Sequence, residues 1–191
     1  MIDSYENALR RHQQVFSQAG ALAPDVLLLA AAVVGCLRSG GKVLWMGNGG
    51  SAADCQHLAA EFMVRYKAER RPLPSIALTT DTSLLTAHTN DYDFDSLFAR
   101  QIEALARPGD LVIGISTSGN SGNVIQGVEQ AARMGVQTAS LLGRDGGKLA
   151  SIADCSVIVD CDETARIQEV HIFIGHWLCE IVDDQLASVD E

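Results

Sequence analysis

Two segments of the sequence are dense in glycine, hydroxyl and amide residues. Residues 47–51 read GNGGS and residues 116–121 read STSGNS, and each lies between an apolar run and a segment with helical periodicity. A helix N-terminus presents free backbone N–H groups and a partial positive charge to an anion. Ser51 is expected to cap the first of these helices, with Asp54 as the partner in a loose capping box. Together the two segments predict a cradle for a monophosphate with a hydroxyl-rich tail.

The first of these segments also permits a dinucleotide interpretation. Gly47, Gly49 and Ala52 match G-x-G-x-x-A, and Asp81 could act as the acid that binds a ribose. That acid should follow after about 20 residues, whereas Asp81 lies about 30 residues beyond the glycines. The G-K-[ST] ending of a Walker A motif is absent from the segment. The sequence therefore disfavours a nucleotide cofactor.

Candidate acid–base groups follow the glycine-rich segment. His57 and Glu61 are four residues apart, so they share one face of the expected helix. They lie roughly 9–15 Å from a phosphate anchored at its N-terminus, the length of a short sugar chain. Spacing alone does not decide between a catalytic pair and a core histidine beside a solvent-facing glutamate. His171 and His176 are about 140° apart around a later helix, so only one should line the site, and spacing leaves open which.

Short apolar runs alternate with helical patterns, which predicts an α/β fold with a parallel sheet covered by helices on both faces. Ligands of such sheets bind beyond the carboxyl ends of the strands, where both polar segments lie. No linker or repeat divides the chain, so one domain is expected over residues 1–191. The predicted strands are residues 42–46, 75–79, 111–115, 137–142 and 155–159, and the predicted helices are residues 3–19, 24–39, 52–67, 82–107, 121–134, 146–151 and 164–187.

Composition and charge narrow the class of protein. The net charge of −10 argues against nucleic-acid binding. No run reaches the roughly 18 apolar residues of a membrane span, and the N-terminus lacks a signal peptide's apolar core, so a cytoplasmic location is expected. The cysteines form no C-x-x-C pair and are expected to be reduced. The helix at residues 24–39 is apolar nearly all round, which predicts packing between subunits without fixing their number.

Three segments carry a resemblance to a known family: residues 47–62 (GNGGSAADCQHLAAEF), residues 116–121, and residues 164–176 (TARIQEVHIFIGH). Together they resemble the phosphoheptose isomerases of the sugar-isomerase (SIS) domain group. The resemblance implies a three-layer α/β/α sandwich with a five-stranded parallel sheet after two N-terminal helices. It implies a homotetramer in which residues 1–40 pack between subunits. It also implies conversion of sedoheptulose 7-phosphate to D-glycero-D-manno-heptose 7-phosphate, the first step toward activated heptose for lipopolysaccharide.

Residue roles follow from the same resemblance. Glu61 and His176 become the acid–base pair, which would decide between the two histidines. Some family members have an aspartate where this chain has Ala165, so that polar contact is either replaced by Arg166 or Thr164 or absent. Some members hold zinc at positions matching His57, Glu61, Gln168 and His176. Substrate contacts are implied for Asn48, Gly49, Gly50, Ser51, Glu61, Asn90, Asp91, Ser116, Thr117, Ser118, Ser121 and Gln168.

The implied mechanism moves a proton between C1 and C2 of the sugar through an enediol. Glu61 would exchange the carbon proton and His176 the oxygen proton, while zinc would polarise the carbonyl. Two alternatives stay open. One is an adaptor of the same group that binds a bacterial replication initiator, which need not keep Glu61, Gln168 and His176 together. The other is an isomerase or sensor for a different phosphosugar.

Overall fold

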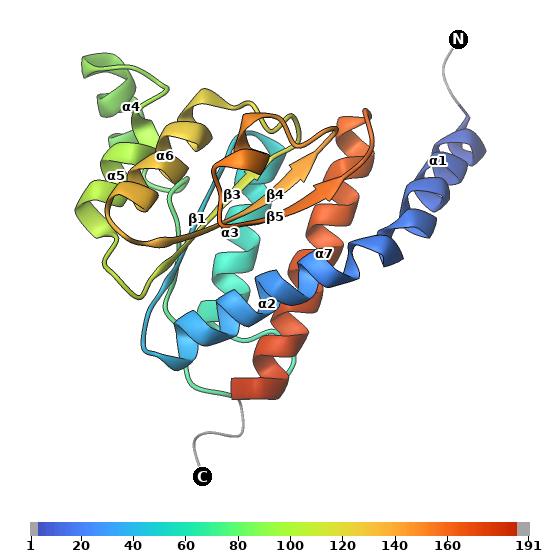
Figure 1. The fold of residues 1–191 in the computed structure, drawn as a ribbon, viewed down its shortest axis with the longest axis horizontal. Helices are drawn as coiled ribbons and strands as arrows, with labels where there is room; N and C mark the ends of the chain where they lie inside the picture. Colours follow the sequence, from blue (N-terminus) through green and yellow to red (C-terminus); the bar gives the residue numbers. More distant parts are fainter. Residues whose placement is uncertain (1–3, 187–191) are drawn as a thin grey trace.

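The computed structural model describes residues 4–186, in which parallel strands and crossover helices alternate (Figure 1). Within this range, the sheet has the strand order β2-β1-β3-β4-β5, and all its strand pairs are parallel. Its strands are β1 Val43–Gly47, β2 Ser75–Ala77, β3 Leu111–Ser116, β4 Gln137–Gly143 and β5 Cys155–Val159. Each strand lies within about two residues of its predicted bounds, because apolar runs bounded by turn residues mark strands well.

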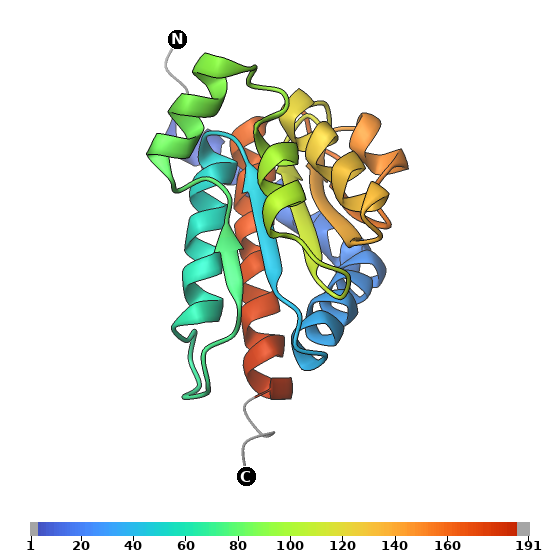
Figure 2. The same cartoon turned by 90° about the vertical axis from the view of Figure 1, so that its left-hand side faces the viewer.

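Helices cover both faces of the sheet (Figures 1 and 2). Successive side chains of a strand point to opposite faces. Accordingly, Val43 and Trp45 of β1 join the hydrophobic layer under the helices at Ala23–Arg38, Gly50–Met63 and Thr164–Leu186. Leu44 and Met46 join the layer under the helices at Leu97–Leu105 and Gly122–Arg133. This is the three-layer α/β/α arrangement after two N-terminal helices that the sequence predicted. The helices are α1 Tyr5–Gln18, α2 Ala23–Arg38, α3 Gly50–Met63, α4 Thr82–Asp91, α5 Leu97–Leu105, α6 Gly122–Arg133 and α7 Thr164–Leu186, with 3₁₀ turns at Ala19–Leu22 and Lys148–Ser151.

The first two helices bury little of their surface in the single chain. α1 has no buried residue, and α2 turns one side, including Leu29 and Val33, to the sheet. Its other side leaves Leu27 and Leu28 more than half exposed. By length and composition alone, the run Tyr5–Arg38 could cross a membrane, and 33% of its most apolar window is buried. A core helix of a soluble protein meets the same criteria.

One helix predicted from the sequence is two separate helices in the structure. Residues 82–107 form α4 and α5 instead of a continuous helix, with a break after Asp91. Within the break, the Asp93 carboxylate accepts a hydrogen bond from the backbone N–H of Ser96 at 2.7 Å. Aspartate side chains compete in this way with helical hydrogen bonds. Residues 3 and 187, the predicted limits of the first and last helices, lie outside the described residues.

Candidate active site

The glycine-rich segment forms the turn from β1 into α3. Gly49 is the N-cap of α3 and has φ +57°, a conformation that favours glycine. Ser51 lies inside the first turn of the helix and is 4% exposed. The predicted serine cap is therefore wrong, because the cap position falls two residues earlier, on Gly49, which has no side chain. The first N–H groups of α3 consequently receive no side-chain cap and can serve an anion.

The serine-rich segment forms the turn from β3 into α6. The Ser116 hydroxyl lies 3.0 Å from that of Ser121 and 3.5 Å from that of Ser118. Gly119, at φ +64°, has no room for a Cβ because the Gly146 carbonyl closes on it. The turn after β4 therefore packs directly against the serine-rich turn that carries these hydroxyls. Thr117, the remaining predicted contact of the segment, is partly exposed in the same turn.

The two turns are tied together by an amide pair. Asn48 and Asn123 each donate to the other's side-chain oxygen at 2.8 Å. Asn123 is 1% exposed, and sequence reasoning missed it because a single asparagine after a serine-rich turn carries no distinguishing spacing. Its position in the first turn of α6 was the only available signal. The predicted phosphate cradle therefore consists of two adjacent turns held in fixed relation.

Two further predicted contacts lie at the end of α4. Asn90 and Asp91 are exposed, and the Asn90 amide donates to the Asp91 carboxylate at 2.8 Å. The following loop reaches the start of α6, where a Cβ on Gly122 would lie 2.5 Å from a carboxylate oxygen of Asp95. Asp95 of this loop therefore lies against the start of α6, directly after the serine-rich turn.

The candidate acid–base residues meet where α3 packs on α7 (Figure 2). The helices approach closely at Gly175, where a Cβ would lie 2.6 Å from Leu58 Cδ2. Beside this contact, Nε2 of His57 and Nε2 of His176 are 2.9 Å apart. One nitrogen must donate and the other accept, since both cannot carry a proton at this distance. The Tyr66 ring stacks on His176 with ring centroids 5.7 Å apart.

Glu61 lies on the other side of the His57 ring. Its Oε1 atom is 3.7 Å from Nδ1 of His57, while Nε2 of that ring faces His176. His57 thus stands between the two predicted catalytic groups. Its side chain is 44% exposed and that of Glu61 23%, so both are open to a small molecule.

Gln168 lies apart from these three residues. A Cβ on Gly50 would lie 2.5 Å from its amide nitrogen, which places Gln168 at the N-terminus of α3. His57 is about two helical turns further along α3. Within the described residues, no group of three or more His, Cys, Asp or Glu side chains is arranged to hold a metal ion. The facing Nε2 atoms are suitable zinc donors, but Glu61 and Gln168 do not converge on them.

The second histidine of α7 has a structural position. His171 is fully buried, and its Nε2–H donates to the Leu142 carbonyl at 2.9 Å. Burial lowers the pKa of His171 to about 4, against the smaller opposing effect of that hydrogen bond. Its Nδ1 atom has no hydrogen-bond partner among the described residues. Of the two histidines that spacing left open, only His176 lies at the candidate site.

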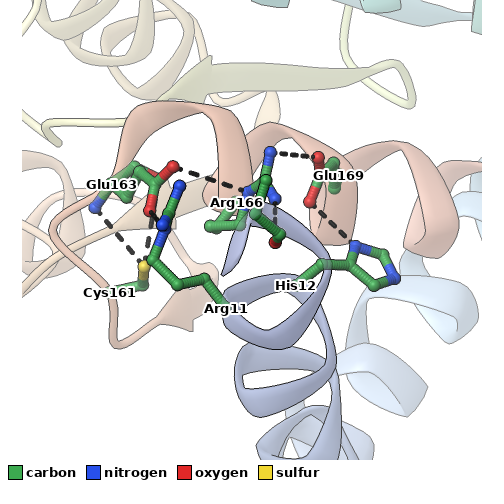
Figure 3. A network of polar contacts seen from close by, with 7 residues as sticks. Arg11, His12, Cys161, Glu163, Arg166 and Glu169 are labelled. Atoms are coloured by element: carbon green, nitrogen blue, oxygen red, sulfur yellow. Dashed lines mark hydrogen bonds and ion pairs between the residues drawn. The ribbon is translucent and has the colours of Figure 1, made fainter. Parts of the chain in front are cut away.

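Charged residues join the start of α7 to α1 (Figure 3). Arg166 pairs with Glu169 at 2.7 Å and donates to the Ala8 carbonyl at 2.9 Å. His12 lies 2.9 Å from Glu169, and Arg11 lies 2.8 Å from Glu163. Arg166 therefore faces α1 and does not take the place of an aspartate at the position of Ala165.

The fold and the two turns at the carboxyl ends of β1 and β3 have the form of a site for a small phosphate ester, with proton-transfer groups beside it. The SIS domain family model matches residues 4–143. The phosphoheptose isomerase of Geotalea daltonii is 52% identical over 187 residues, which is 97% of each chain. That of Aquifex aeolicus is 56% identical over 166 residues, which is 87% of each chain.

Solved structures agree with these relatives. The phosphoheptose isomerase GmhA from Neisseria gonorrhoeae superposes with a TM-score of 0.87 at 43% identity, over 92% of this chain and 96% of that one. A phosphoheptose isomerase from Francisella tularensis gives a TM-score of 0.91 at 38% identity, over 94% and 96%. The chain therefore belongs to the SIS-domain family, in its phosphoheptose isomerase group.

Proposed function

We propose that this chain is an aldose–ketose isomerase that interconverts sedoheptulose 7-phosphate and D-glycero-D-manno-heptose 7-phosphate. The relatives that share about half of its residues over nearly its whole length are phosphoheptose isomerases. The structural observation that carries the proposal is the contact of His57 with His176, 2.9 Å apart on two different helices. It brings Glu61 and His176 to the same end of one site. An adaptor would have no need of this arrangement.

The start of α3 binds the substrate phosphate, and residues further along the helix carry out proton transfer. The free N–H groups at its start and the hydroxyls of Ser116, Ser118 and Ser121 bind the phosphate. Helical side chains lean toward the N-terminus, so Glu61 reaches back along α3 toward the first carbons of the sugar. Glu61 exchanges the proton between C1 and C2, and His176 moves the proton between the two oxygens. Gln168, beside Gly50, orients the phosphate end of the substrate.

Zinc remains part of the proposal, with His57 and His176, of the four predicted ligands, as the two that the geometry supports. The mutually facing Nε2 atoms of the two histidines support it. The positions of Glu61 and Gln168 do not, so no step above depends on the metal. When bound, zinc would polarise the substrate carbonyl. Isothermal titration with zinc at neutral pH, using wild type and His57→Ala, tests the assignment without any turnover.

We further propose a cytoplasmic homotetramer that supplies heptose for lipopolysaccharide. Residues 1–40 would pack between subunits, because Leu27 and Leu28 of α2 and Phe173 of α7 expose more than half of their surface. Light scattering on wild type and on Leu27→Glu measures the assembly. A monomeric wild type would contradict this part of the proposal.

Conversion of sedoheptulose 7-phosphate tests the function directly. Wild type is expected to turn over, and Glu61→Gln is expected to lose about 10²-fold or more of kcat. Each protein is assayed after treatment with chelator and after addition of zinc. Sedoheptulose 7-phosphate left unchanged by folded wild type under all these conditions would overturn the proposed function. A phosphosugar panel in the same assay then separates another substrate from no catalysis.

A further inference from the structure

A buried ion pair joins the two helices that carry the proposed acid–base residues. Arg70, in the connection from α3 to β2, places its Nε atom 2.8 Å from Oδ1 of Asp183 on α7. Their side chains are 0% and 7% exposed. A pair this deep overcomes its desolvation cost only when its remaining polar atoms are also hydrogen-bonded. Both partners here bond to backbone groups next to the candidate site.

Arg70 holds the end of α3. Its Nη1 atom donates to the Phe62 carbonyl at 2.8 Å and its Nη2 atom to the Glu61 carbonyl at 2.9 Å. The last carbonyls of a helix lack partners within the helix, so the guanidinium acts as a C-terminal cap. The backbone of Glu61, a proposed catalytic residue, is thereby fixed by a residue outside the helix.

Asp183 holds the segment that follows α3. Its Oδ2 atom accepts hydrogen bonds from the backbone N–H groups of Lys67 and Ala68, both at 2.8 Å. Burial alone would raise the pKa of Asp183, but these amides and Arg70 outweigh it and lower the pKa. Tyr66, the residue before the first of these amides, stacks on His176. Asp183 therefore holds the backbone that directly follows Tyr66, whose ring supports the second proposed catalytic residue.

We propose that Arg70 and Asp183 are positioning residues of the isomerase. The pair sets the relation of Glu61 on α3 to His176 on α7, through the Glu61 carbonyl and the Tyr66 ring. Neither side chain is exposed enough to contact substrate, so the pair acts only through these neighbours. The inference rests on the proposed function, because it concerns the geometry of that reaction. A displacement of about 1 Å at reacting groups can cost about 10²-fold in rate.

The chain contains a matched control elsewhere in the fold, outside the contact between α3 and α7. The Asp110 side chain is 6% exposed and pairs with the Lys42 ammonium. It also accepts from the backbone N–H groups of Lys42 at 3.0 Å and Arg107 at 2.8 Å. Like Asp183, it is a buried carboxylate that takes one cation and two backbone amides. It lies at the amino ends of β1 and β3, and its partners Lys42 and Arg107 belong to neither α3 nor α7.

The experiment compares Asp183→Asn with Asp110→Asn. Both are measured for kcat and KM with sedoheptulose 7-phosphate, for the free energy of unfolding, and for the imidazole NMR resonances of His176. Both variants should lose stability to a similar degree. Only Asp183→Asn should lower kcat, by about tenfold to 10²-fold with KM changed by less than about threefold, and shift the His176 resonances. Arg70→Lys, which keeps the charge but loses the planar fork, should act in the same direction.

Equal effects of the two aspartate variants on kcat, with unmoved His176 resonances, would overturn the inference. If Asp183→Asn does not fold, Arg70→Lys is compared with Asp110→Asn by the same measurements. If wild type does not convert sedoheptulose 7-phosphate, the proposed function fails. In that case the His176 resonances alone decide whether the pair positions this ring, since they require no turnover.

Discussion

Lowering the pH from 7 to 5 should destabilise the protein through His171. The folded state holds this imidazole neutral, because burial lowers its pKa to about 4 from 6.5. The unfolded chain takes up a proton near pH 6.5. Between these values the unfolded state binds more protons, so stability falls as the pH falls. Across the whole window, at 1.36 kcal/mol per pH unit, the loss approaches about 3 kcal/mol, and about 2 kcal/mol is reached by pH 5.

The measurement is urea unfolding of wild type and His171→Gln at pH 7, 6 and 5, at one protein concentration. Glutamine does not titrate, and its amide can still donate to the Leu142 carbonyl that His171 Nε2 contacts at 2.9 Å. Every other titrating group is common to both proteins. The stability difference between wild type and variant should therefore shift by about 2 kcal/mol against wild type from pH 7 to pH 5. A difference that stays constant over this range would refute the assignment of a buried neutral imidazole.

Three further substitutions test the packing around the site. Gly175→Ala should lower the free energy of unfolding by about 1–3 kcal/mol and lower kcat, because its Cβ would lie 2.6 Å from Leu58 and push α3 away from α7. Thermal unfolding measures the stability and steady-state kinetics measure kcat. Unchanged values of both would contradict the close approach of the two helices. Asp54→Asn should stabilise the protein at pH 7, since burial raises the pKa of this carboxyl and one of its oxygens has no hydrogen-bond partner among the described residues. Denaturant unfolding measures this, and a lower free energy of unfolding in the variant would count against the prediction. Asn123→Leu should raise KM more than it lowers kcat, because it removes the amide pair with Asn48 that joins the two turns proposed to bind phosphate. A change confined to kcat would show that the pair does not serve binding.

Much of the fold follows from local patterns in the sequence. The apolar runs predict all the described strands, because a strand buried on both faces needs continuous apolar residues. The spacing of His57 and Glu61 places them on one helical face, and in the structure Glu61 lies 3.7 Å from His57. Glycine, hydroxyl and amide residues mark the two turns. Strand positions, the shared helical face and the two turns all depend on residues only a few positions apart in the sequence.

Local patterns failed where a backbone conformation or a single side-chain hydrogen bond decided between alternatives. The helix cap falls on Gly49 instead of Ser51. The helix predicted over residues 82–107 breaks where Asp93 bonds to the Ser96 backbone. Ser51 is a residue type that commonly caps helices, and residues 82–107 have helical periodicity. The glycine conformation and the aspartate hydrogen bond that override these patterns do not recur along the sequence, so periodicity cannot reveal them.

The choice of histidine belongs to the tertiary structure. His171 and His176 lie on the same helix, and their spacing shows only that they face different directions. The register of α7 on α3, set by the contact of Gly175 with Leu58, puts His176 beside His57 and His171 in the core. The sequence by itself determined the strands, most of the helices and the two polar turns. Which residues meet depends on how distant helices pack, because packing is fixed by side-chain shapes that no local spacing encodes.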